Sequence, residues 1–239
     1  MQETGKFNAL ILGVSIFLGL SSLGYLLAQA AITFKEYERT VTVKGLSEHE
    51  YTADVAIWPI EFTLASNKVQ DLYADIETNT QTIIRFLTSH GIKAADITLN
   101  APAITDKSAQ QYGGSERAEF RYTGMQTVTV YSDDIETVRT VMGQLAELGK
   151  QGIVLSGNNY QSQTEYLFTR LNEIKPEMIE EATRKAREVA EKFAADSQSS
   201  LGKIRRASQG QFSISPRDNN NPHIKKVRVV STIEYYLSD

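Results

Sequence analysis

The chain has 239 residues, of which 25 are lysine or arginine and 29 are aspartate or glutamate, so its net charge near neutral pH is −4. Such a mildly acidic chain lacks the basic face of a nucleic-acid binder, and we expect no nucleic-acid partner. It contains no cysteine, which excludes disulfides, thiol catalysis and cysteine metal sites.

Residues 8–34 carry no charged side chain, and this apolar segment predicts a helix that spans a membrane. Its most apolar part, from Ala9 to Leu27, is about 19 residues long, close to the roughly 20 that a helix needs to cross a bilayer core. A signal-peptide core is shorter, at roughly 7 to 15 residues. The length therefore favours a retained anchor in contact with membrane lipid, marked by Ala9, Gly13, Phe17, Gly24 and Leu27.

The same segment ends in a motif that a signal peptidase could cut. Ala28 and Ala30 form a small-x-small pattern, and cleavage after Ala30 would release a soluble protein. A buried helix of a soluble protein is a third alternative. Lys6 and Lys35 flank the segment almost symmetrically, so the charge bias that orients membrane helices is near a tie.

The pattern of the remaining residues predicts the fold class. We expect a membrane anchor or signal segment at 1–34 and one domain at 35–239, which is long enough for a real core. Its fold is expected to be α+β, with mostly antiparallel strands and three main helices in two α/β subdomains. The stretches "GIKAADITLNAPAIT" and "LGKIRRASQGQFSIS" echo each other, as two related units would, although a common helix–turn–strand order explains them equally well.

Strand patterns run through residues 39–67, beginning with Val41 and Val43, and the later part is irregular. The alternation of Val55 and Ile57 changes phase before Ile60 and Phe62. The change falls at Pro59, which cannot donate a hydrogen bond to a sheet. We therefore expect a bulge or an edge bend there, with the neighbouring tryptophan packed against it.

Apolar periodicity and capping signals predict the first two helices. One runs from Asn67 to Gly91 and begins with Asn67 and Gln70 as a capping box. The other begins with Asp133 and Glu136 as a second capping box and continues to Gly149.

The third helix is predicted to begin near Pro176, a favourable first helical position. On its polar face, acids precede bases by four residues, an order that stabilises helices. These expected ion pairs are Glu180 with Arg184, Glu181 with Lys185 and Glu188 with Lys192. The expected buried stripe is Ile179, Ala182, Ala186, Val189, Ala190 and Phe193.

The other segments predict strands and connectors. Residues 95–105, 119–132 and 152–170 have strand patterns, and residues 106–118 form a glycine-containing, polar connector. Two strands close the chain, at 202–215 and 225–237. The last alternates apolar and charged residues, which is typical of an antiparallel sheet with one face in water.

The sequence contains no recognisable catalytic or metal-binding motif. His49, His90 and His223 are far apart and lack metal-ligand spacing, and no nucleophile elbow or nucleotide-binding loop occurs. We therefore expect no catalytic residue, metal or cofactor. The basic cluster of Lys203, Arg205 and Arg206 is interpreted as a solvated surface, with an acidic partner or lipid headgroups as the alternative.

Several pieces together resemble the SIMPL-domain family, also called DUF541, which includes bacterial periplasmic immunogenic proteins. They are Gly45 after the first strand, "GIKAADI", the strand "YTGMQTVTV" and the alanine-rich third helix closing on "LGKI". The resemblance spans nearly all of residues 39–238. It implies an α+β fold, export to the cell envelope, homo-oligomers that are proposed to be ring- or channel-like, and links to envelope or oxidative stress. It implies no catalytic residues.

Three functions follow as hypotheses. The first is a non-enzymatic envelope protein, anchored in the inner membrane, whose periplasmic domain self-associates. The second is a cleaved, soluble periplasmic stress-response or binding protein. The third is an enzyme of unknown type with a cleft between subdomains. The longer apolar segment favours the first, and the small-molecule ligand, if there is one, stays unknown.

Overall fold

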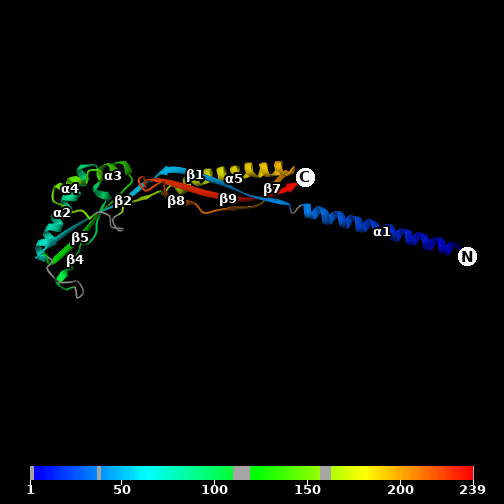
Figure 1. The fold of residues 1–239 in the computed structure, drawn as a ribbon, viewed down its shortest axis with the longest axis horizontal. Helices are drawn as coiled ribbons and strands as arrows, with labels where there is room; N and C mark the ends of the chain where they lie inside the picture. Colours follow the sequence, from blue (N-terminus) through cyan, green and yellow to red (C-terminus); the bar gives the residue numbers. More distant parts are fainter. Residues whose placement is uncertain (1–2, 37–38, 110–118, 157–162, 239) are drawn as a thin grey trace. The chain divides into compact units, whose positions relative to one another are not determined.

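The structure is a computed structural model that describes residues 3–36, 39–109, 119–156 and 163–238 (Figure 1). Its helices and antiparallel sheets confirm the α+β fold with an N-terminal apolar helix. In chain order the helices and strands are α1 (Glu3–Glu36), β1 (Thr40–Thr52), β2 (Val55–Ser66), α2 (Val69–Ser89), β3 (Ile97–Leu99), β4 (Ala103–Asp106), β5 (Tyr122–Ser132), α3 (Ile135–Met142), α4 (Ala146–Lys150), β6 (Glu165–Leu167), α5 (Leu171–Asp196), β7 (Ser200–Gln209), β8 (Ser213–Pro216) and β9 (Ile224–Ser238), with short 3₁₀ helices at Ala94–Asp96 and Lys107–Ala109.

The chain divides into two compact units, each assembled from separate stretches of sequence. Unit 1 comprises residues 1–48, 176–212 and 228–239, and unit 2 comprises residues 49–175 and 213–227. The sequence pattern predicted two subdomains, but neither unit is a continuous part of the chain. Strands β1 and β9 and helix α5 each contribute residues to both units.

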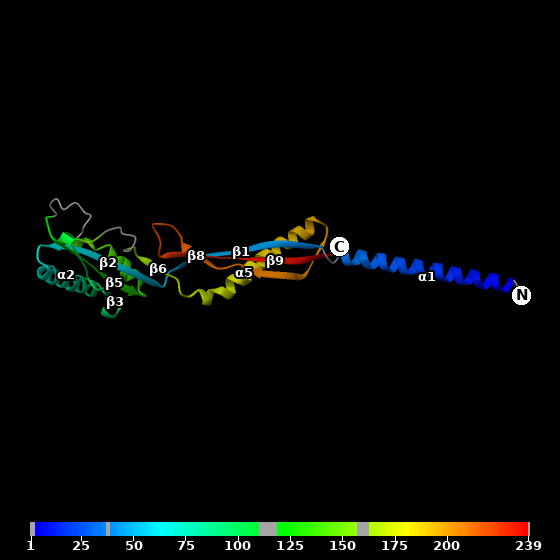
Figure 2. The same cartoon turned by 90° about the horizontal axis from the view of Figure 1, so that it is seen from below.

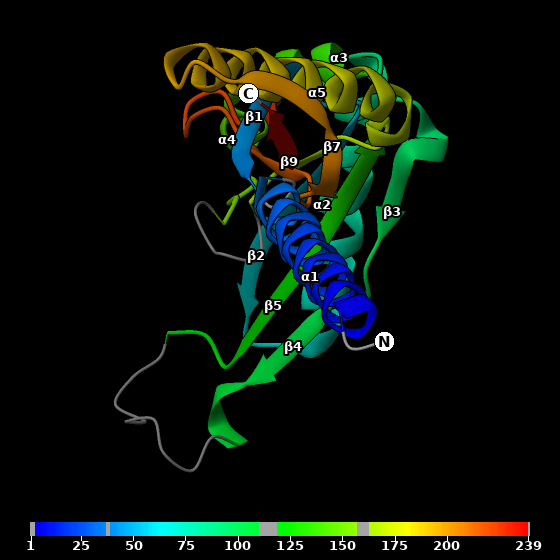
Figure 3. The same ribbon diagram turned by 90° about the vertical axis from the view of Figure 1, so that its right-hand side faces the viewer.

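Unit 1 is built from an antiparallel sheet and helix α5. The strand order is β1-β9-β7, and α5 lies along one face of these strands (Figures 2 and 3). The apolar core between them contains Val43, Ile233 and Tyr235 from the strands and Ala186 and Ala190 from the helix. The predicted alternation of β9 is confirmed, because Val227, Val229, Ile233 and Tyr235 are buried whereas Arg228 is exposed.

Helix α5 approaches the sheet more closely than its sequence pattern predicted. Its buried residues are Met178, Ala182, Ala186, Ala190 and Ala194, most of them alanines four residues apart. The predicted stripe is therefore partly wrong, since the side chain of Val189 is exposed and Phe193 is 55% exposed. A row of alanines lets two backbones approach, whereas larger side chains on that row would hold them apart.

The start and the polar face of α5 also differ from the prediction. The helix begins at Leu171, so that Pro176 lies inside it. Of the predicted ion pairs, Glu181 with Lys185 forms at 2.8 Å. The other two are replaced by pairs in which the base precedes the acid: Arg184 with Glu188 at 4.0 Å and Arg187 with Glu191 at 3.7 Å.

Unit 2 is a second antiparallel sheet with helices on one face. The strand order is β3-β5-β2-β6, and β4 also pairs with β5. Helices α2 and α3 pack against β2 and β5, and Leu148 of α4 joins the same core (Figure 1). The largest fully buried side chains of this core include Phe62, Leu72, Ile83, Leu87, Leu148, Val128, Val130, Val138 and Val141.

The predicted bend at Pro59 is absent. β2 pairs with β5 in one unbroken register from Ala56 opposite Ser132 to Ser66 opposite Tyr122. The buried face is set by Ala56, Trp58, Ile60 and Phe62, so Ile57 points to the other face. β6 pairs with only the first residues of β2, Val55 to Ile57. The missing N–H of Pro59 is therefore accommodated without a bulge.

Both predicted capping boxes are wrong. Helix α2 has Lys68 at its N-cap with no side-chain hydrogen bond. The Asn67 side chain instead accepts a hydrogen bond from the Arg121 backbone N–H at 3.0 Å. Helix α3 is capped one residue later than predicted, by Asp134, which accepts a hydrogen bond from the Thr137 N–H at 3.0 Å.

Several predicted segments break into shorter elements. The second predicted helix is divided into α3 and α4, because α3 ends with Gly143 as its C-cap. The predicted strand at 95–105 forms β3 and β4, and the one at 202–215 forms β7 and β8. Most of the predicted polar connector and the middle of the predicted strands at 152–170 lie outside the described residues.

Candidate functional site

Helix α1 contains every residue that the sequence assigned to a membrane segment or a cleavage site. Its stretch Ile11–Thr33 has a mean hydropathy of 2.0 over 23 residues, and none of it is buried. At 1.5 Å per residue this stretch is about 34 Å long, enough to cross a bilayer core of about 30 Å. The residues concerned are Ala9, Gly13, Phe17, Gly24, Leu27, Ala28 and Ala30.

Most polar side chains of this stretch share one side of the helix. Ser15, Ser22 and Gln29 follow one another at intervals of seven residues, which places them on one stripe of a helix. The Gln29 amide also donates a hydrogen bond to the Tyr25 hydroxyl at 3.1 Å. In a bilayer, such side chains are the ones that hydrogen-bond between helices.

The carboxylates with shifted pKa values hold loops and caps together. Burial alone would raise the pKa of Asp54, but hydrogen bonds from the Thr169 N–H and hydroxyl and from Arg170 outweigh it and lower the value. The Thr137 hydroxyl and N–H lower the pKa of Asp134 at its helix cap. Both carboxylates thus have a structural role: Asp54 links the start of β2 to the segment before α5, and Asp134 caps α3.

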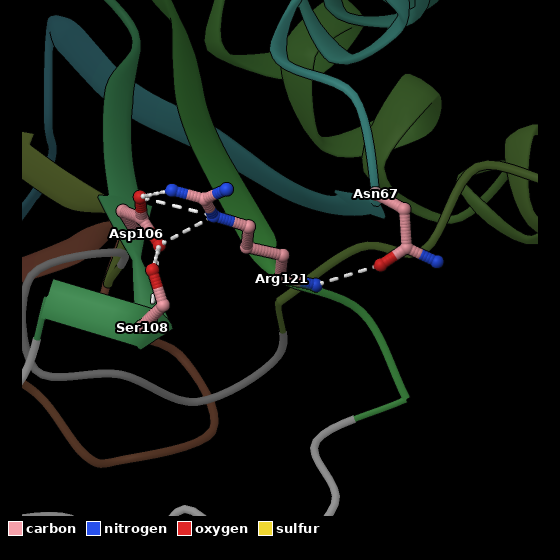
Figure 4. A network of polar contacts seen from close by, with 4 residues as sticks. All are labelled: Asn67, Asp106, Ser108 and Arg121. Atoms are coloured by element: carbon pink, nitrogen blue, oxygen red, sulfur yellow. Dashed lines mark hydrogen bonds and ion pairs between the residues drawn. The ribbon is translucent and has the colours of Figure 1, made fainter.

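Asp106 and Arg121 form an ion pair in which the guanidinium donates to both carboxylate oxygens (Figure 4). The Arg121 guanidinium donates to Asp106 at 2.8 Å and 3.2 Å, and Ser108 donates from its N–H and its hydroxyl. The arginine, followed by Ser108, holds the pKa of Asp106 well below its usual range. The Asn67 side chain also accepts a hydrogen bond from the Arg121 backbone N–H. The network therefore links the segment before residue 110 to the segment after residue 118.

The three histidines lie in different surroundings. His90 ends α2, where its ring bonds to the Phe86 carbonyl oxygen at 2.7 Å and packs on the Phe86 ring. The His49 ring lies 6.2 Å from the ring of Tyr51. His223 lies before β9 and is 7% exposed. In the described part of the chain, no group of three or more acidic or histidine side chains is placed to hold a metal ion.

A concave site in unit 2 surrounds His223. We call it the histidine pocket; its volume is about 770 Å³. Its walls come from α3, from β6 with the residues before it, and from the loop between β8 and β9. The lining residues are Arg139, Gln163, Thr164, Tyr166, Pro216, Asp218, Asn219, Asn220, Pro222 and His223.

The β8–β9 loop is held in one conformation by its own carboxylate. Asp218 accepts hydrogen bonds from the N–H groups of Asn220 and Asn221 at 2.8 Å and from the Arg217 guanidinium at 2.9 Å. The hydrogen bond from Arg217, helped by those from the asparagines, lowers the pKa of Asp218 to about 2, although burial acts in the opposite direction. The loop therefore keeps its charge and its shape at any physiological pH.

Buried polar rings form the inner wall of the histidine pocket. The His223 ring meets the Tyr166 ring edge-on, with centroids 6.0 Å apart. Burial, followed by the positive charge of Arg139, lowers the pKa of His223, so its imidazole is neutral near pH 7. Burial likewise raises the pKa of Tyr166, which keeps its phenol protonated.

Sequence reasoning did not find this pocket. Its three key side chains, Arg139, Tyr166 and His223, stand on segments that are distant in sequence, and the lone histidine has no ligand spacing around it. The one local signal is the turn-rich "PRDNNNPH" before the last strand, which predicts a loop but no ligand.

The comparisons with known proteins agree with the resemblance seen in the sequence. The model of the SIMPL family, described as proteins of unknown function (DUF541), matches residues 41–232. No curated protein matches the chain. The matched range begins at the second residue of β1, extends through β8 and most of β9, and lies wholly after α1. The chain therefore belongs to the SIMPL family, with an apolar helix preceding the family domain.

Proposed function

We propose that this protein is an inner-membrane-tethered SIMPL protein whose domain faces the periplasm. The observation that carries the proposal is the exposed apolar stretch Ile11–Thr33, which has the length of a bilayer core. Exposing so many apolar side chains to water would be unfavourable, at roughly 25 cal/mol per Å² of apolar surface. Lipid removes this penalty. The periplasmic side is supported by the family resemblance, because the flanking lysines give no clear bias.

The continuity of α1 supports a retained anchor over a cleaved signal peptide. Ala28 and Ala30 lie inside α1, which continues to Glu36. A peptidase that binds its substrate in an extended conformation uses the backbone N–H and C=O groups of that substrate. In a helix these groups are already paired with one another. The small-x-small motif is therefore helical in the intact chain, which favours the uncut form.

Membrane fractionation tests the tether. The full chain is expected to stay with the membrane pellet through an alkaline wash, and a variant lacking residues 2–34 is expected to be soluble. Leu23→Arg should weaken retention, because an arginine near the centre of a span costs about 2.5–3.5 kcal/mol on insertion scales, whereas Leu23→Ile should not. Full release of the intact chain by the wash would contradict the proposal.

We further propose that the domain self-associates. Among the described residues, β1 and β7 are the outer strands of their sheet, and outer strands offer unpaired backbone groups to another chain. The polar stripe on α1 and the small-residue pairs Ala9/Gly13 and Gly24/Ala28 support association within the membrane as well.

The mass of the full chain in detergent tests self-association. Light scattering is expected to give a multiple of the 26.6 kDa chain mass. Leu46→Lys places a charge on an exposed position of β1 and should lower that mass, whereas Tyr73→Lys, on an exposed position of α2, should not. A clean monomer at micromolar concentration would rule out the assembly.

A non-enzymatic role is the third part of the proposal. It is supported by the use of Asp54, Asp106, Asp134 and Asp218 as caps and loop fasteners, which accounts for their lowered pKa values without catalysis. A role in envelope or oxidative stress is supported by the family resemblance. Loss of the gene should then sensitise cells to peroxide or to membrane-damaging agents.

A further inference from the structure

The histidine pocket contains buried polar groups that the protein itself leaves without strong partners. Within the described residues, neither ring nitrogen of His223 has a hydrogen-bond partner, although the residue is only 7% exposed and lines the pocket. The Tyr166 hydroxyl makes only a 3.8 Å contact with the Met142 sulfur, which is a weak acceptor. Because both residues line the pocket, these polar groups are available to hydrogen-bond a polar ligand there.

Arg139 supplies the positive charge of the pocket. One of its terminal nitrogens lies 3.4 Å from Glu136, and the side chain is 39% exposed. A guanidinium has five N–H donors in a planar fork, so this single contact leaves most of them available. Such a fork matches the two oxygens of a carboxylate. Three hydrogen-bond donors thus come from different parts of the fold: Arg139 from α3, Tyr166 from β6 and His223 from the β8–β9 loop.

The charge balance selects the class of anion. Arg139 is paired with Glu136, and Arg217 is paired with Asp218 at 2.9 Å and lies 3.6 Å from Glu50. These two arginines and three carboxylates sum to a net charge of −1, which disfavours a doubly charged phosphate more than a singly charged carboxylate. The Asn219 and Asn220 side chains also line the pocket and can bind hydroxyl groups.

We propose that the histidine pocket binds a small, hydroxyl-bearing organic carboxylate, whose oxygens accept hydrogen bonds from Arg139, Tyr166 and the His223 imidazole. The volume of about 770 Å³ lies in the usual range for small-molecule sites. This site is independent of the membrane tether, since all its residues belong to unit 2.

The proposal carries a pH dependence with a definite sign. The free His223 ring is neutral, and the groups that face it are Arg139 and Glu136 from α3, Arg217 and Asp218 from the loop, and Tyr166 from β6. A bound carboxylate adds a negative charge beside the ring and favours its protonated form. Binding therefore takes up a proton, and affinity rises as the pH falls.

Histidine NMR of the full chain in detergent micelles tests the site, with ¹³C-labelled imidazole rings and the His223 signal assigned through His223→Gln. The probes are gluconate, sorbitol and sorbitol 6-phosphate, which share one open-chain skeleton. Gluconate is expected to shift the His223 signal saturably and to leave His49 and His90 unmoved. Its affinity should fall about five- to tenfold between about pH 6 and about pH 8.

Matched variants separate the site from general charge effects. Arg139→Gln should weaken gluconate binding about tenfold or more, while Arg85→Gln, which removes an arginine of α2 outside the pocket, should leave it unchanged. Tyr166→Phe removes one hydroxyl and keeps the ring, so it gives a second reading if Arg139→Gln does not fold. The proposal is overturned if gluconate leaves His223 unmoved, if sorbitol or sorbitol 6-phosphate binds as tightly, or if the Arg139 and Arg85 variants behave alike.

Discussion

Gly45→Ala is expected to destabilise unit 1 by about 3 kcal/mol or more, because the added methyl group has no room. A Cβ at this position would overlap the backbone carbonyl of Ala182 and lie 2.5 Å from the backbone nitrogen of Ala186. Both atoms belong to the backbone of α5 and cannot rotate away as a flexible side chain would. The helix must therefore move off the sheet and lose its contacts with Val43 and Tyr235.

Thermal unfolding followed by circular dichroism, with hydrogen exchange of α5 and β1, measures this effect. Gly149→Ala is the matched control, because its Cβ meets open space inside helix α4. Alanine is favoured over glycine in a helix by roughly 0.5–1 kcal/mol, so the control should be neutral or slightly stabilising. If both variants unfold at the wild-type temperature, the close contact of β1 with α5 is wrong.

Phe62→Ala is expected to destabilise unit 2 by about 3–5 kcal/mol, the range for removing a buried aromatic side chain. Phe62 is fully buried in β2, between the strands and the helices that cover them. Its loss leaves a cavity that a paired central strand cannot easily close, since β5 holds β2 in register along its length. Fluorescence of Trp58, the single tryptophan, reports the unfolding of this core.

Phe193→Ala provides the control with the same chemical change. Phe193 is 55% exposed on α5, so its truncation should change the free energy of unfolding by less than about 1 kcal/mol. The pair also distinguishes the structure from the sequence prediction, which placed Phe193 in the buried stripe of its helix. Equal losses in urea unfolding would restore the predicted stripe and refute the observed one.

Hydrophobic periodicity correctly predicted the elements whose pattern can be recognised from their own residues alone. The alternation of β9 needs one wet face and one buried face, and the apolar run of α1 needs no tertiary partner at all. Both were read correctly from the sequence. The stripe of α5 was misjudged because apolar size suggested Val189 and Phe193, whereas the close approach to Gly45 selects alanines.

Features that depend on distant partners could not be predicted. Pro59 is tolerated in an unbroken strand because β6 pairs only as far as Ile57, and this length is not encoded near the proline. Asn67 was expected to cap a helix, yet it binds the Arg121 backbone, 54 residues away. The histidine pocket likewise depends on a loop and two elements that only the tertiary fold brings together.

The state of the N-terminus in native membranes tests the account most directly. The polypeptide is isolated from membranes of its native host, and its intact mass is measured. If α1 is a retained anchor, the native chain is membrane-bound and keeps Ile11–Thr33. A native chain that begins at Ala31 and is recovered in the soluble periplasmic extract would contradict it.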